Sequence, residues 1–150
     1  MTTQPETHTT VRVAILRGRI AAAEGDHEGA LVTATEVVER LGRLGILPFV
    51  AEAKLLQGTS LAALGRWPEA EGVLREARAG AEALGHRRVL WQILRELGRV
   101  RAAEGDAEEA SRLKDEAGRI VLEIASTIDD EPLRASFLTR PDVVTVLPER

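Results

Sequence analysis

The chain contains no cysteine, no tyrosine and no asparagine. These absences exclude disulfide bonds, thiol chemistry, thiolate metal sites and N-glycosylation. The sequence also has no apolar run of about 18 residues, and its first ten residues lack the basic start and the apolar stretch of a signal peptide. We therefore expect a cytoplasmic protein with no membrane-spanning segment and no membrane partner.

The residues that are present have the balance of a folded domain. Hydrophobic residues make up 44% of the 150 residues and charged residues 29%, which is enough apolar surface for one domain with a core. The net charge is −4, and arginines alternate with glutamates, as in Arg75-Glu76 and Arg95-Glu96. This alternation favours ion pairs along helices, so we expect no nucleic-acid partner.

One segment occurs three times, as residues 16–30, 56–70 and 96–110. The copies are spaced by 40 residues and align without gaps, which indicates a repeat architecture. Three sets of small residues coincide when the copies are superimposed: Gly18, Gly58 and Gly98; Gly25, Gly65 and Gly105; and Ala30, Ala70 and Ala110. The first set falls in the middle of a helix and implies that two helices approach closely there.

Each copy reads as two helices joined by a tight turn. The segments are rich in alanine, leucine, glutamate and arginine, a glycine stands where the first helix should end, and Asp26 and Asp106 follow as N-cap candidates. No strand-like alternation competes. We predict helices over 10–24, 27–44, 49–64, 68–84, 88–104 and 107–127, paired as the hairpins 10–44, 49–84 and 88–127.

The ends of the chain depart from the repeat. We expect residues 1–9 to be a disordered tail. Residues 128–150 should form a helix and a tail, with Asp130 as the N-cap, Leu133, Phe137 and Leu138 on one face and Pro141 as the stop. We expect this helix to cover the last hairpin, because a stack of repeats otherwise ends in an exposed apolar face.

The repeated pattern resembles the tetratricopeptide repeat (TPR) over residues 10–127, most closely at Leu97-Gly98 followed by Ala110. The period is 40 rather than about 34 residues. No tryptophan precedes the glycine. The tyrosine of the TPR pattern is replaced by Ala21, Leu61 and Arg101, and its phenylalanine is replaced by Ala34, Leu74 and Lys114. The resemblance implies an all-α solenoid of three helical hairpins with a C-terminal capping helix.

The long period and the segment 130–143 resemble the C-terminal TPR arrays of large bacterial regulators that carry an ATPase or nucleotide-cyclase domain. This resemblance implies a module of a bacterial signalling or transcription regulator.

Catalytic and metal-binding patterns are missing. None of the three histidines, His8, His27 and His86, lies beside a second ligand type at metal spacing. The sequence contains no phosphate loop, dinucleotide fingerprint or nucleophile elbow. We predict a protein that is not an enzyme and that needs no cofactor or metal.

The TPR resemblance implies that the first helices of the hairpins line a concave groove that receives a peptide or a partner helix. The face opposite the core stripe holds Arg12, Ile15, Leu16 and Arg19; Glu52, Leu55, Leu56 and Thr59; and Gln92, Arg95, Glu96 and Arg99. From this face we select as partner-binding residues Arg12, Leu16, Arg19, Leu55, Thr59, Arg95 and Arg99. The alternatives are that the leucines pack neighbouring hairpins and the arginines are solvated, or that the chain is a structural domain that forms a homodimer.

Three further positions bear on this surface. Trp67 and Trp91 are expected to be structural, although Trp91 could instead border the groove. Arg101 and Lys114 stand where the other copies have apolar residues, so we expect the third hairpin to meet solvent or a partner there.

Overall fold

The computed structural model describes residues 8–148, and every regular element within that range is an α-helix. The helices are α1 (His8–Ala23), α2 (His27–Leu44), α3 (Val50–Ala63), α4 (Trp67–Leu84), α5 (Arg87–Ala103), α6 (Ala107–Ser126), α7 (Glu131–Leu138) and α8 (Pro141–Val144). The six predicted repeat helices are confirmed, each boundary within two residues. The expected disorder of residues 1–9 is wrong for residues 8 and 9, which belong to α1, and residues 1–7 lie outside the described part.

The repeated glycines and aspartates set the helix boundaries. Gly25, Gly65 and Gly105 each have a positive φ, between 75° and 92°, a left-handed conformation that glycine adopts without steric cost. The Asp26 side chain accepts the Gly29 N–H at 2.9 Å and so caps α2. Asp106 caps α6 in the same way, so both predicted N-caps are confirmed.

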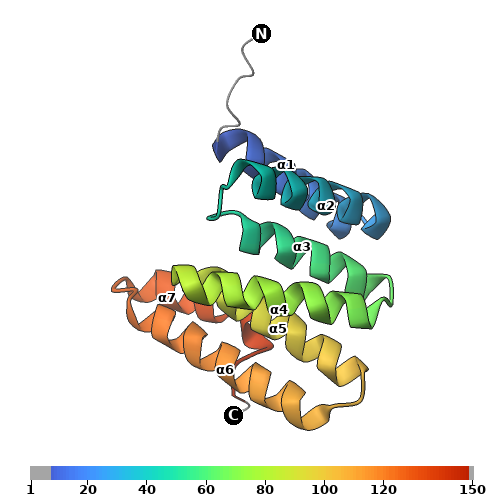
Figure 1. The fold of residues 1–150 in the computed structure, drawn as a ribbon. Coiled ribbons are helices and arrows are strands. Elements are labelled where there is room, and N and C mark those ends of the chain that lie inside the picture. The colour runs from blue at the N-terminus through green and yellow to red at the C-terminus, as the bar shows by residue number, and fades with distance from the viewer. Residues whose placement is uncertain (1–7, 149–150) are drawn as a thin grey trace. The chain divides into compact units, whose positions relative to one another are not determined.

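The chain divides into two compact units, with the boundary between Ala77 and Arg78 inside α4. In the first unit α1 and α2 lie side by side, and α3 packs on both (Figure 1). The mid-helix glycines permit the close packing. A Cβ added to Gly18 would lie 2.5 Å from Leu56 Cδ2, and a Cβ added to Gly58 would lie 2.5 Å from Leu74 Cγ.

The second unit is built on the antiparallel pair α5 and α6. One face of α5 is a buried apolar stripe, which consists of Leu90, Ile93, Leu94, Leu97 and Val100. Gly98 lies beside α6: a Cβ added to it would be 3.4 Å from the Ala110 carbonyl oxygen. The glycine and alanine of the repeat therefore meet across this hairpin, as the sequence predicts.

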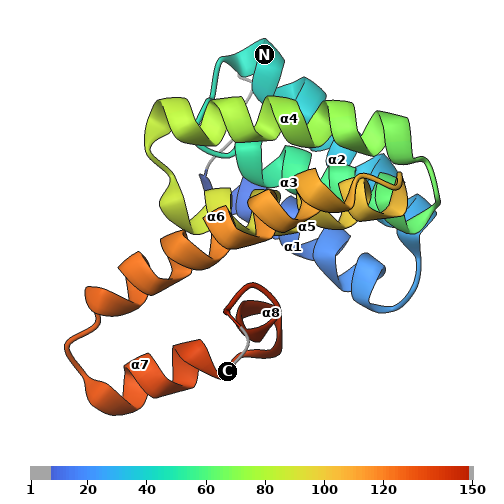
Figure 2. The ribbon, with the colours of Figure 1, turned by 90° about the horizontal axis from the view of Figure 1, so that it is seen from below.

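The C-terminal segment covers α6 differently from the prediction. Asp130 caps α7 as expected, but α7 has no buried residue, and Leu133 is 62% exposed. Figure 2 shows α7 turning back alongside α6, with α8 after it. Val143 and Val146 are the buried residues of this segment, and the Val146 carbonyl lies against Gly118 of α6. The cover is thus α8 with the residues that follow it, because a glycine in α6 lets that backbone approach closely.

Candidate functional site

The first unit carries a hollow of about 360 Å³ along α1. The predicted residues Arg12, Leu16 and Arg19 line it, and so does Glu52 of α3. Leu16 is 54% exposed, and Val13 and Ile20 are exposed beside it on the same helix face. Three of the seven predicted binding residues therefore gather at one accessible surface.

The α3 residues of the predicted face do not join this hollow, apart from Glu52. Leu55 and Thr59 are half-buried and do not line it. Leu56 is 6% exposed, because it fills the space beside Gly18, and Ile15 is a core residue. Leu56 is therefore a packing residue, as the alternative interpretation of the leucines expects, whereas Ile15 is a core residue that also borders the hollow.

The second unit contains a larger pocket, of about 590 Å³, between α5, α6 and the C-terminal segment. The predicted residues Arg95 and Arg99 line it. Ala102 lines it as well, and so does Lys114, which the sequence predicts to meet solvent or a partner. The remaining lining residues were not assigned to a binding surface from the sequence: Gly98, Ala107, Ala110, Ser111, Thr145 and Val146. Most of these side chains are small, which gives the pocket its space and an apolar floor.

A buried carboxylate organises one side of this pocket. Glu96 is 7% exposed, and its Oε1 accepts a hydrogen bond from Arg95 Nη1 at 3.0 Å and from Arg99 Nη1 at 3.1 Å. Arg95 also donates through Nε to Thr145 Oγ1 at 2.8 Å, which ties α5 to the C-terminal segment. Glu96 therefore positions two guanidinium groups at the pocket, although the sequence prediction placed it on the groove face itself.

The repeat register explains why the pocket is open. Leu74 stands 40 residues before Lys114, and Gly58 stands 40 residues before Gly98. In the second copy Leu74 is fully buried against Gly58. In the third copy Lys114 is exposed, and both Lys114 and Gly98 line the pocket. The space that a leucine fills beside Gly58 is thus left open beside Gly98.

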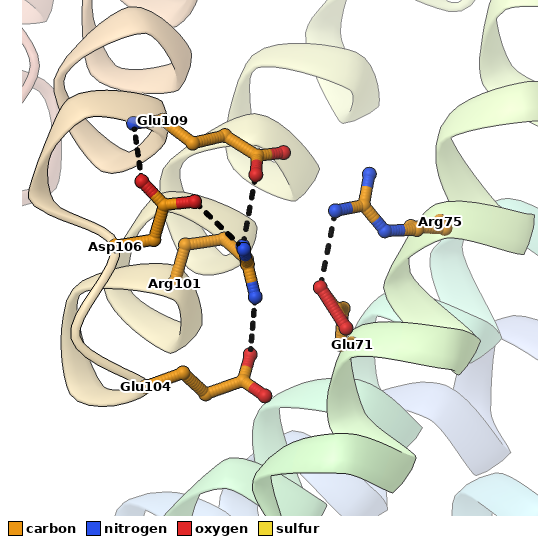
Figure 3. Close-up of polar contacts among 6 residues, drawn as sticks. All are labelled: Glu71, Arg75, Arg101, Glu104, Asp106 and Glu109. Carbon is orange, nitrogen blue, oxygen red and sulfur yellow. Dashed lines mark hydrogen bonds and ion pairs between the residues drawn. The ribbon is translucent and has the colours of Figure 1, made fainter.

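Arg101, the other polar departure in the third copy, has partners within its own hairpin (Figure 3). Its guanidinium donates to Glu104 at 3.2 Å, to Asp106 at 2.8 Å and to Glu109 at 3.0 Å. Its side chain is only 20% exposed. The Glu109 N–H, and then Arg101, hold the pKa of Asp106 below its ordinary value. The sequence predicts that Arg101 meets solvent or a partner. Instead, its guanidinium bonds to carboxylates of its own hairpin at the start of α6.

The two tryptophans differ in environment. Trp91 is 1% exposed, so it belongs to the core and does not border a groove. Trp67 is half-buried at the start of α4. The structural interpretation is therefore confirmed for Trp91.

A third hollow, of about 380 Å³, lies on α2, α3 and the first part of α4. Gln57 donates to Thr35 at 3.3 Å within it, and Arg66 forms two hydrogen bonds to Glu69. Its polar side chains thus already have partners within the first unit, since Glu76 accepts from Lys54, and no repeated signal in the sequence marks it.

Within residues 8–148 no three histidine, aspartate or glutamate side chains are grouped so that they could hold a metal ion. In the same range no helix has both the length and the apolar character needed to cross a bilayer. A scan against models of known protein families matches none, and a search of the curated proteins finds no similar sequence.

Proposed function

We propose that this chain is a cytoplasmic, non-catalytic protein-interaction module of the TPR type, a solenoid of three hairpins that serves in a bacterial signalling or transcription regulator. It engages a peptide or a partner helix through the first helices of its hairpins, α1 in the first unit and α5 in the second. The 40-residue repeat and its helical hairpins support the TPR-like architecture.

One observation carries the binding proposal. The hollow on α1 and the pocket on α5 are each lined by apolar side chains and by two of the predicted arginines. Apolar contact combined with arginine donors is typical of surfaces that bind peptides, since the apolar contacts give affinity and the guanidinium groups give orientation.

The test is selection of binders from a displayed library of random peptides. We expect the wild-type chain to enrich binding peptides, and the Arg19→Glu/Arg99→Glu variant to bind them at least about tenfold more weakly, because a charge-assisted hydrogen bond becomes a repulsion. Circular dichroism should be unchanged, and the Tm should fall by only about 2–4 °C, because Arg95 still pairs with the buried carboxylate of Glu96 when Arg99 is replaced.

The matched control is the Arg17→Glu/Arg88→Glu variant, whose arginines are exposed on the same two helices but outside the hollow and the pocket. It should bind as the wild type does. A library that yields no binder, or binders unaffected by the Arg19→Glu/Arg99→Glu change, would overturn the proposed function.

The second candidate function is self-association, and the exposed stripe of Val13, Leu16 and Ile20 on α1 favours it. Self-association predicts that the mass measured by light scattering rises to that of a dimer across a hundredfold concentration range, and that Leu16→Glu returns it to the monomer. The interaction module predicts a monomer at every concentration.

A further inference from the structure

We propose that the pocket between α5 and α6 receives an acidic peptide segment of a partner protein. An aliphatic side chain of the segment rests on the small residues of the floor, and a neighbouring carboxylate lies between Arg99 and Lys114. This inference rests on the proposed function and names the partner chemistry for one of its surfaces.

The first step concerns shape. The floor includes Gly98, Ala102 and Ala110, and a Cβ at Gly98 would meet no atom closer than 3.4 Å. In the second copy the corresponding glycine is covered by the aliphatic side chain of Leu74. The space beside this glycine, between the two helices, therefore accommodates an aliphatic side chain. In the third copy that side chain must come from outside the hairpin. A pocket of about 590 Å³ is large enough for such a side chain and its neighbours.

The second step concerns charge. Three cationic side chains, Arg95, Arg99 and Lys114, face the pocket, and Glu96 supplies one carboxylate shared between the two arginines. Lys114 is exposed and has no ion-pair partner within the described range of 8–148. The pocket therefore has an excess of positive charge, and Arg99, with its side chain 65% exposed, can offer further N–H donors to a carboxylate.

The third step selects the occupant. A neutral apolar segment would leave the excess positive charge of the pocket without a partner. A nucleic acid would offer phosphates but no aliphatic side chain for the floor. An acidic segment that also carries leucine, isoleucine or valine satisfies both parts of the pocket. The net charge of the chain is −4, so the positive potential is local to this site.

The decisive variant is Lys114→Leu, which gives the third copy the residue of the second. The new leucine should cover Gly98 as Leu74 covers Gly58, occupy the part of the pocket beside Gly98 and remove one cation. In the displayed-peptide selection, we expect wild-type chain to enrich peptides with a carboxylate next to an aliphatic residue. Lys114→Leu and Arg99→Glu should each weaken the best peptide by about tenfold or more. Arg119→Glu, an exposed arginine of α6 outside the pocket, is the control and should bind normally.

A coupling measurement completes the test. Replacing the glutamates of the selected peptide by glutamine should weaken binding to the wild type. It should have little effect on binding to an Arg99→Gln/Lys114→Gln variant, because both cations beside the peptide carboxylate are then gone and Arg95 stays bonded to Glu96 and Thr145. Peptides that bind Lys114→Leu as tightly as wild type, or whose glutamates prove irrelevant, would overturn this inference and leave the proposed function standing. Displacement of the peptide by equimolar glutarate would also overturn it, since the site would then be one for small acids.

Discussion

At the scale of single residues, Ser60 is the clearest anomaly. Its hydroxyl on α3 is fully buried and has no hydrogen-bond partner within the described part of the chain. The position 40 residues later is Val100, which is buried and apolar. A buried hydroxyl without a partner lowers stability, because the group loses its bonds to water on folding.

We therefore expect Ser60→Ala to raise the free energy of unfolding by about 0.5–2 kcal/mol, as measured by urea denaturation. Ser126→Ala is the comparison, since the Ser126 hydroxyl is exposed and donates to the Glu123 carbonyl at 2.6 Å. Its effect should stay within about 0.5 kcal/mol. A loss of more than about 1 kcal/mol in Ser60→Ala would mean that the hydroxyl is bonded in solution.

At the scale of an element, the start of α6 depends on the cluster around Arg101. Asp106 accepts the Glu109 N–H at 3.0 Å, and Arg101 joins the carboxylates of Asp106 and Glu109. The cap and the ion pairs therefore act together on the first turn of this helix.

Replacing Asp106 by alanine should lower the Tm by about 2–4 °C, which is the shift typical of a lost N-cap in a chain of this length. The pKa of Asp106 is lower in the folded chain than its ordinary value. Its stabilising effect is therefore complete above the ordinary pKa of about 3.9 and is lost as the pH falls through the folded pKa.

Asp106→Asn separates the two contributions, because asparagine still caps a helix but carries no charge. We expect this variant to keep most of the wild-type Tm at pH 7 and to show a smaller loss of stability between pH 5 and pH 2. Equal acid sensitivity in Asp106→Asn and the wild type would show that other carboxylates control the acid response.

At the scale of the whole molecule, the residues after α7 complete the second unit. Val143 is fully buried, while the adjacent Val144 is 52% exposed. The two valines thus provide a matched pair for testing whether this segment covers α6 in solution.

We expect Val143→Ala to lower the free energy of unfolding by about 1.5–3 kcal/mol, the cost of removing two buried methyl groups and leaving a cavity. Val144→Ala should stay within about 0.5 kcal/mol. Equal effects of the two changes, measured by thermal and urea denaturation, would contradict the observed cover.

The helices of the repeated segments could be predicted because residues at their own ends determine where each helix begins and ends. Glycines with a left-handed conformation and N-cap aspartates recur at a fixed spacing, so each copy supports the assignment of the others. The role of α8 could not be predicted, because a four-residue helix has no periodicity and its burial depends on the backbone approach at Gly118.

The candidate site was predictable only in part, for a similar reason. Arg95 and Arg99 could be placed on this surface because the face of α5 follows from its spacing, and Lys114 could be singled out because it departs from the other copies. Thr145 and Val146 come from outside the repeat, and the burial of Leu56 depends on a contact with Gly18 that spacing alone does not reveal.

The contrast between Leu74 and Lys114 has a consequence for how such arrays can diversify. In the second and third copies, the residue at one register position decides whether the space beside the mid-helix glycine is filled or vacant, whereas in the first copy Leu56 of the next hairpin fills the space beside Gly18. In these two copies one substitution should therefore be enough to create or remove a cavity, while the helix boundaries and the turns stay as they are. The aliphatic side chain at this position is thus the difference between the closed second hairpin and the third hairpin with its open pocket.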